Sequence, residues 1–152
     1  MQLGVISDTH GLLRPEAVEA LGGARQIIHA GDVGSPEILK QLRTMAPVTA
    51  VRGNVDKDAW AQQLPQTQVL EIGGISIYIL HDLTQLDVKP EAAGFRVVIS
   101  GHSHIPKQDV RNGVLYFNPG SAGPRRFRWP VTVGRLSIAR AEVSAELVIL
   151  NV

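Results

Sequence analysis

The feature that most constrains the fold is an alternation of short apolar runs with amphipathic segments in the first third of the chain. Mostly apolar runs at residues 3–6, 26–29 and 48–51 each lead into glycine together with Asp, His or Asn. Between them, residues 15–21 and 36–45 have the pattern of helices, each with proline in its first turn. The order strand–helix–strand–helix–strand is typical of a parallel sheet with crossover helices.

The rest of the chain is richer in strands. Strand-like runs cover residues 69–72, 75–80, 97–100, 107–110, 114–117, 131–138 and 142–150. Gly73-Gly74 and Arg111-Asn112-Gly113 separate neighbouring runs, which predicts two β-hairpins. We therefore expect an α/β fold with two packed, mixed β-sheets flanked by helices, as a single domain over residues 1–152.

Composition excludes several classes of protein. The 152 residues carry a formal net charge of +1, and a general nucleic-acid binder is usually more basic, so we expect no stable nucleic-acid complex. The absence of Cys excludes a disulfide scaffold, an iron–sulfur cluster and thiol catalysis. No apolar window is long enough to span a membrane, and the first residues lack a basic signal region. We expect a cytoplasmic protein with no membrane partner.

Residues of the types that bind metal ions collect where the predicted strands end. They are Asp8, His10, Asp32, Asn54, His81, His102 and His104. Ligands of open α/β sheets bind beyond the carboxyl ends of the strands, so we expect these side chains to share one edge of a sheet. Nitrogen and oxygen ligands without sulfur suit Mn, Fe, Co, Ni or Zn. Seven candidates exceed one tetrahedral site but suit two metal ions that share a carboxylate.

The spacing adds to this interpretation. Asp8 and His10, and likewise His102 and His104, are two residues apart, so in extended backbone the members of each pair would point to one face. Taken singly, each residue also fits a turn, a cap or a structural role. Their conjunction favours metal binding, because four of the five His fall at predicted strand ends. The fifth, His29, lies inside a strand, and we interpret it as a core or supporting residue.

Taken in order, these residues resemble the motifs of the calcineurin-like metallophosphoesterase family. They stand as Asp8-Thr9-His10, Gly31-Asp32, Gly53-Asn54-Val55-Asp56, His81-Asp82 and Gly101-His102-Ser103-His104. Asn118-Pro119-Gly120-Ser121 is similar to a segment of the small bacterial and archaeal phosphodiesterase branch. The resemblance covers roughly residues 3 to 125 and implies an α/β/β/α sandwich.

The resemblance also implies a ligand set and a reaction. Asp8, His10, Asp32 and His104 would hold one divalent metal ion. Asp32, Asn54, His81 and His102 would hold a second. Asp32 and a hydroxide would bridge the two ions, and this hydroxide would attack a small phosphodiester substrate. Asp32, Asn54 and His102 would take part in catalysis, and Asn54 and Arg125 would contact the substrate. Mn²⁺ is the expected metal, with Ni²⁺, Co²⁺, Fe²⁺ and Zn²⁺ as alternatives.

Two positions depart from the family pattern. Val55 stands where many members have a His that donates a proton, so we expect substrates with acidic phenol leaving groups to react best. Asp82 stands where relatives usually have Gly. With Gln85 it resembles a helix capping box, which we favour, and the alternative is that it crowds or supplements the second metal site.

Two further points concern binding. Residues 125–129 form a basic and aromatic patch that fits phosphate, nucleic acid or membrane, although a solvated or subunit-contact loop is the default interpretation. The fold also resembles that of a retromer scaffold subunit, so a catalytically weak, protein-binding module is the alternative function. The sequence leaves homo-oligomerisation open.

Overall fold

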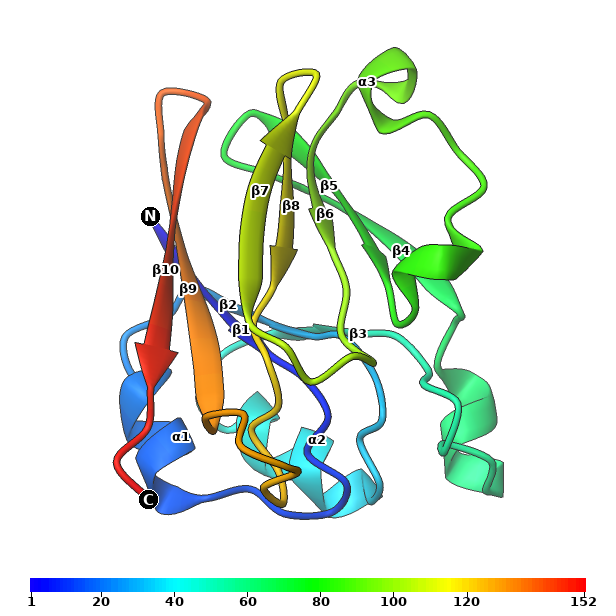
Figure 1. Cartoon of the computed structure of the whole chain (residues 1–152), viewed down its shortest axis with the longest axis vertical. Helices are drawn as coiled ribbons and strands as arrows, with labels where there is room; N and C mark the ends of the chain where they lie inside the picture. Colours follow the sequence, from blue (N-terminus) through cyan, green and yellow to red (C-terminus); the bar gives the residue numbers. More distant parts are fainter.

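Two five-stranded β-sheets pack face to face in the computed structural model, which describes all residues from 1 to 152 (Figure 1). The first sheet has the strand order β10-β9-β1-β2-β3 and the second has the order β4-β5-β6-β8-β7. The strands are β1 (Gln2–Ile6), β2 (Gln26–His29), β3 (Val48–Ala50), β4 (Thr67–Ile72), β5 (Ile75–Leu80), β6 (Phe95–Ile99), β7 (Lys107–Arg111), β8 (Val114–Asn118), β9 (Thr132–Ala139) and β10 (Glu142–Ile149).

The first sheet contains the parallel unit that the sequence predicts. Strands β1, β2 and β3 pair in parallel, and the connections between them contain α1 (Pro15–Ala20) and α2 (Pro36–Arg43). Helix α2 begins where the Oγ of Ser35 accepts a hydrogen bond from the amide of Glu37 at 3.3 Å. Both helices end one or two residues earlier than predicted. Strands β9 and β10 extend the sheet as an antiparallel hairpin beside β1.

The second sheet is mixed. Strands β5, β6 and β8 pair in parallel, while β4 and β7 pair antiparallel at the two edges. The chain around this sheet also contains three short helical segments: η1 (Ala59–Gln63), η2 (Leu83–Gln85) and α3 (Pro90–Ala93). The capping box at Asp82 predicted the start of η2, whereas η1 and α3 were not predicted. Segments of three to five residues are too short to show a helical hydrophobic period.

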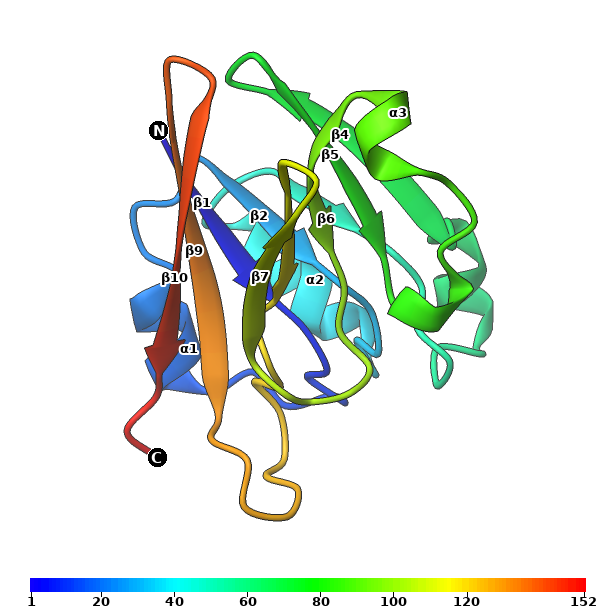
Figure 2. The same ribbon diagram turned by 45° about the horizontal axis from the view of Figure 1, so that its top comes forward.

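Three apolar clusters hold these layers together. The central cluster lies between the sheets and includes Leu3, Ile77 and Phe117, all almost fully buried. A second cluster packs α1 and α2 against the outer face of the first sheet, and a smaller one covers the outer face of the second sheet near η2 and α3 (Figure 2). The α/β/β/α layering expected from the sequence is confirmed.

The packing of the two sheets also brings the carboxyl ends of five strands together. Strands β1, β2 and β3 of one sheet and β5 and β6 of the other deliver their carboxyl ends to a shared region between the sheets. The loops that follow these five strands carry every candidate metal ligand. No helix of the structure is long and apolar enough to cross a membrane.

Candidate metal centre

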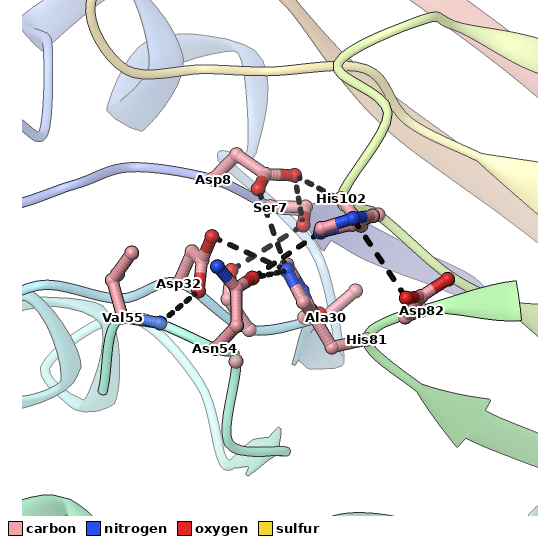
Figure 3. A network of polar contacts seen from close by, with 12 residues as sticks. Ser7, Asp8, Ala30, Asp32, Asn54, Val55, His81, Asp82 and His102 are labelled. Carbon is pink, nitrogen blue, oxygen red and sulfur yellow. Dashed lines mark hydrogen bonds and ion pairs between the residues drawn. The ribbon is translucent and has the colours of Figure 1, made fainter. Parts of the chain in front are cut away.

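The structure brings the seven candidate ligands together in two adjacent groups. Asp8, His10 and His104 form one group, and Asp32, His81 and His102 form the other. Within each group the ligand atoms lie within 4.8 Å of one another. Asn54 joins the second group through its side-chain oxygen, which lies 3.0 Å from His81 Nε2 and 3.2 Å from His102 Nδ1 (Figure 3).

The backbone of these loops is not extended, so the extended geometry expected for each pair is wrong. Five of the seven residues have positive φ: Asp8 (56°), His10 (46°), Asp32 (55°), His102 (70°) and His104 (63°). Residues other than glycine adopt this left-handed region rarely, and at a cost. With this turned backbone, Asp8 and His10 lie in one group, whereas His102 and His104 lie in different groups.

Glycines make the close approach of these loops feasible. A Cβ atom at Gly53 would strike the backbone and the carboxylate of Asp32. A Cβ atom at Gly101 would strike the hydroxyl of Ser7 and approach Asp8 Oδ2 at 2.7 Å. Glycine at these two positions therefore allows the loops after β3 and β6 to lie directly against the two carboxylates.

The first group is arranged around Asp8, which is fully buried. Its Oδ1 lies 3.4 Å from His104 Nε2 and 3.8 Å from His10 Nε2. Its other oxygen, Oδ2, accepts hydrogen bonds from the hydroxyl of Ser7 at 2.7 Å and from the amide of His102 at 3.1 Å. These two bonds leave Oδ1 directed at the imidazoles.

Asp32 lies between the two groups. Its Oδ2 is 3.2 Å from His81 Nε2 in the second group and 3.7 Å from His10 Nε2 in the first. Its Oδ1 accepts a hydrogen bond from the amide of Val55 at 3.0 Å, which fixes the orientation of the carboxylate. Asp32 is therefore placed for a shared, bridging role. Asp8 Oδ1 also faces the second group, but at a longer distance of 3.9 Å from His81 Nε2.

The tautomer of His81 follows from its contacts. Its Nδ1 is 2.7 Å from the carbonyl oxygen of Ala30, and because a carbonyl only accepts, Nδ1 carries the proton. In the neutral ring, Nε2 then presents a lone pair toward Asp32 Oδ2 and Asn54 Oδ1. Three acceptor atoms then converge on one point. A cation satisfies them, as does a proton on Nε2, which the raised pKa of His81 favours.

The residues present fit a metal ion. Asp8 Oδ1 and His10 Nε2 are buried and have no hydrogen-bond partner in the structure. Buried polar atoms in folded proteins are nearly always paired, and these two face each other across the first group. Oxygen and imidazole nitrogen ligands without thiolates suit the divalent transition metals.

The electrostatics of the site favour ionised carboxylates. Burial alone would raise the pKa of Asp8, but the contacts with His10, His104 and Ser7 and the His81 charge hold it well below its usual range. The pKa of Asp32 is lowered too, since contacts with His81 and the Val55 amide outweigh the effect of burial. Burial opposes the charge on His81 as well, yet Asp32 and Asp8 raise its pKa. Both carboxylates are therefore anionic and ready to bind a cation.

Two residues expected to support the site hold its loops. Asp56 accepts hydrogen bonds from the amides of Val33, Gly34 and Gly53, so it joins the loops after β2 and β3. His29 is fully buried, and its Nδ1 accepts from the amide of Gly31 at 3.1 Å. Neither residue contacts a ligand imidazole by a hydrogen bond; for His81 that role belongs to the carbonyl of Ala30.

Sequence reasoning missed two groups that orient the ligands. The hydroxyl of Ser7 binds Asp8, and the side-chain amide of Asn118 donates to the carbonyl of Gly101 at 2.9 Å and to the Ser103 hydroxyl at 3.2 Å. Asn118 belongs to a segment already singled out by resemblance. Ser7 precedes a ligand directly in the chain, which was the only signal available for it.

Asp82 caps a helical segment and also borders the second group. Its Oδ1 accepts from the amide of Thr84 at 3.0 Å and so caps η2, as expected. Its Oδ2 also lies 3.7 Å from His102 Nε2, at the end of the polar network opposite Asp32 (Figure 3). The side chain of His102 is 46% exposed, so the Asp82 carboxylate borders the second group on the side that faces solvent.

Two other positions lie outside the ligand groups. The side chain of Val55 is 45% exposed, and only its amide contacts the site, through Asp32. Arg125 was expected to contact the substrate, but the structure does not bring it to the site. Its guanidinium donates instead to the carbonyl of Val152 at 3.3 Å, on an exposed loop that also carries Phe127, 89% exposed.

Comparisons with known proteins agree with this geometry. A family model described as a calcineurin-like phosphoesterase superfamily domain matches residues 1–141. A probable metallophosphoesterase from Methanothermobacter thermautotrophicus is 36% identical, and the alignment covers 97% of this chain and 92% of that protein. The phosphodiesterase YfcE of Escherichia coli is 28% identical over 90% of this chain and 87% of its own length.

Solved structures share the fold. An archaeal phosphodiesterase superposes with a TM-score of 0.80 at 24% identity, covering 97% of this chain and 100% of that one. Vps29 of Chaetomium thermophilum superposes with a TM-score of 0.79 at 20% identity, covering 97% of each chain. With the family match over residues 1–141, this chain belongs to the calcineurin-like phosphoesterase superfamily, and its strand ends carry two groups of Asp and His side chains that could hold metal ions.

Proposed function

We propose that the chain is a phosphodiester hydrolase that uses two divalent metal ions, held by the seven ligands described above. The observation that carries this proposal is the position of Asp32 Oδ2, 3.2 Å from His81 Nε2 and 3.7 Å from His10 Nε2. One carboxylate oxygen faces the imidazoles of both groups, which is the arrangement that two ions sharing a ligand require.

The proposed reaction is the hydrolysis of one ester bond of a phosphodiester. The oxygen of a water molecule forms a bond to phosphorus, the P–O bond to one ester group breaks, and the departing alcohol or phenol takes a proton. Two divalent ions would activate water and compensate the charge on the phosphoryl oxygens. Asp8, His10 and His104 would hold one of them, and Asn54, His81 and His102 the other, with Asp32 between.

The chain's own residues supply orientation. Ser7 and the Val55 amide fix the two carboxylates, and the Ala30 carbonyl fixes the ring of His81. Position 55 offers no proton donor, because its side chain is apolar. Leaving groups that need no protonation, such as nitrophenols, should therefore depart fastest, and a rate independent of leaving-group pKa would contradict this.

Mn²⁺ is our first choice of metal, since two carboxylates, an amide oxygen and four imidazoles form a mixed oxygen and nitrogen set. Ni²⁺, Co²⁺, Fe²⁺ and Zn²⁺ are the alternatives. We place the protein in the cytoplasm and take a small diester as its substrate.

The alternative of a protein-binding module has one observation in its favour, the shared fold with Vps29. The buried carboxylates and the unpaired Asp8 Oδ1 favour a metal site, but Vps29 of Entamoeba histolytica has been crystallised in complex with Zn²⁺, so a metal site alone does not separate the two functions. The similarity to the phosphodiesterase YfcE favours the enzyme. Asp32→Ala should leave partner capture unchanged in a module and abolish turnover in an enzyme.

The test is hydrolysis of bis-p-nitrophenyl phosphate by protein stripped of metal and then supplied with Mn²⁺, Ni²⁺, Co²⁺ or Zn²⁺ in turn. Metal-dependent turnover is expected in the wild type and in Asp58→Ala, an exposed carboxylate outside both groups. Asp32→Ala should lose at least about a thousandfold in rate, as removal of a bridging ligand implies. Absence of turnover with every metal would overturn the proposal.

A further inference from the structure

Two hollows border the metal centre, and they meet at Asp82, which lines both. One hollow, of about 360 Å³, opens beside His102 and extends along the outer face of β7 and β8. The other, of about 440 Å³, opens beside Asn54 and His81. His102 lines one hollow, and Asn54 and His81 line the other. The remaining lining residues hold no metal ion in the proposed site, so the space beyond these ligands is available to the organic part of a substrate.

The two hollows differ in chemistry. The one beside Asn54 has Leu80 as its single apolar lining residue, and the rest of its wall is polar or glycine. The one beside His102 has four apolar lining residues: Leu83, Ile105, Tyr116 and Phe117. Only the second hollow can bury an apolar or aromatic group against apolar neighbours. We call it the Tyr116 hollow.

Tyr116 is held in place as part of a stack. The guanidinium of Arg111 lies 4.9 Å from the centre of its ring, and Asp109 holds Arg111 through a 2.8 Å ion pair. In the β7–β8 pairing, Asp109 lies opposite Tyr116 and Lys107 opposite Asn118, so these side chains share one face of the sheet. Lys107 is exposed and makes no ion pair, so its ammonium is free for acceptor oxygens on a bound group.

The geometry of phosphoryl transfer suggests where the ester group that stays on phosphorus would lie. In phosphoryl transfer the attacking and leaving oxygens lie roughly in line. In the proposed reaction the attacking water would lie on the side of the buried carboxylates of Asp8 and Asp32, and the leaving group would depart toward solvent. The ester group that stays on phosphorus would then lie to the side, where the hollows open. A cavity of roughly 150 Å³ holds benzene, so the Tyr116 hollow has room for an aromatic ring.

We propose that the Tyr116 hollow binds the ester group that remains on phosphorus, and that it selects diesters in which this group is an aromatic ring or carries one. The inference rests on the proposed hydrolase function and adds a substrate class to it. A nucleoside has this chemistry, with a planar base for Tyr116 and sugar oxygens for Lys107. A small alkyl group would leave the apolar wall of the hollow without a partner.

Two diesters with the same leaving group test the proposal: p-nitrophenyl phenyl phosphate and p-nitrophenyl methyl phosphate. With Mn²⁺, the wild type should have a kcat/KM about five- to tenfold higher for the phenyl diester, after correction for the uncatalysed rates. Tyr116→Leu should bring this ratio close to one. Tyr116→Phe, which keeps the ring, should preserve it. Gln66→Ala, in the other hollow, is the matched control and should also preserve it.

A binding measurement gives a readout that does not depend on turnover. Phenyl phosphate should bind Mn²⁺-loaded protein about five- to tenfold more tightly than methyl phosphate in calorimetric titrations, and Tyr116→Leu should remove the difference. Hydrolysis of both diesters with an unchanged ratio in Tyr116→Leu would overturn the inference alone. No hydrolysis of either diester with any metal would instead overturn the proposed function. Thermal unfolding of each variant checks that it is folded.

Discussion

Five of the seven candidate metal ligands lie on left-handed backbone, which is energetically costly. His102 has a φ of 70° and a side chain that is 46% exposed, so its imidazole gains little from packing. Left-handed backbone costs a residue with a Cβ atom roughly 1–2 kcal/mol, and glycine avoids most of that cost. Strain of this kind persists at functional sites because the surrounding structure imposes it.

A pair of variants at position 102 measures this strain. In metal-free protein, His102→Gly should be about 0.5–1 kcal/mol more stable than His102→Ala, because only glycine relieves the left-handed backbone. Both variants lack the imidazole, so the comparison isolates the backbone. Urea unfolding in the presence of a chelator gives the two free energies. An alanine variant as stable as the glycine variant would show that the loop is not strained.

His29 makes the stability of the protein depend on pH. Burial lowers its pKa from 6.5 to about 4, so the native state keeps this ring neutral where the unfolded chain takes up a proton. Stability from this group is complete above pH 6.5 and falls as the pH drops toward 4, by about 3 kcal/mol in total. His29→Gln, which retains a donor and an acceptor, should show a shallower loss of unfolding free energy between pH 7 and 5. Equal slopes in both proteins would contradict the assignment.

Some properties of the individual site residues were predictable from the sequence, and others were not. The ligand types and their order were predictable because each lies just after an apolar run. Their grouping matches the one implied by the resemblance, which places His102 and His104 with different metal ions. The spacing alone put these two His on one face, because it assumed extended backbone where both residues have positive φ. The role of Arg125 was inferred from its nearness in the chain to a motif, and the exposed loop carries it to Val152 instead.

At the scale of elements, three hairpins use one turn geometry with three different sequences. The two turn residues have positive φ in Gly73-Gly74, in Asn112-Gly113 and in Arg140-Ala141. Type I′ turns of this kind strongly prefer Asn and Gly. The first two turns were therefore predictable, whereas Arg140-Ala141 was recognised only through the alternating pattern of the strands on either side.

The third turn is a site where stability can be gained. Replacing Arg140-Ala141 by Asn-Gly should stabilise the protein by about 1 kcal/mol, since both residues are then suited to left-handed backbone. The Ala141 methyl packs partly against the central cluster, and its loss reduces the gain. The reverse exchange, Asn112→Arg with Gly113→Ala, should destabilise the protein. Urea midpoints measure both, and a loss of stability in the first variant would contradict the turn assignment.

At the scale of the whole molecule, the candidate metal centre is a product of the layering. Asp8 comes from the first sheet and His104 from the second, 96 residues apart in the chain, and their side chains lie 3.4 Å apart. Two packed sheets were predictable from the alternating helices and strands followed by the strand-rich half. The partner of each strand was not, because the pairing of β9 with β1 depends on contacts between residues far apart in the chain.

The central claim is that the two ligand groups hold two metal ions with Asp32 between them. The most direct measurement is a titration of metal-free protein with Mn²⁺, followed by electron paramagnetic resonance. The account predicts two ions per chain with an exchange-coupled spectrum, and loss of the coupling in Asp32→Asn. A single ion per chain, or two ions that give only the spectrum of isolated Mn²⁺, would contradict it.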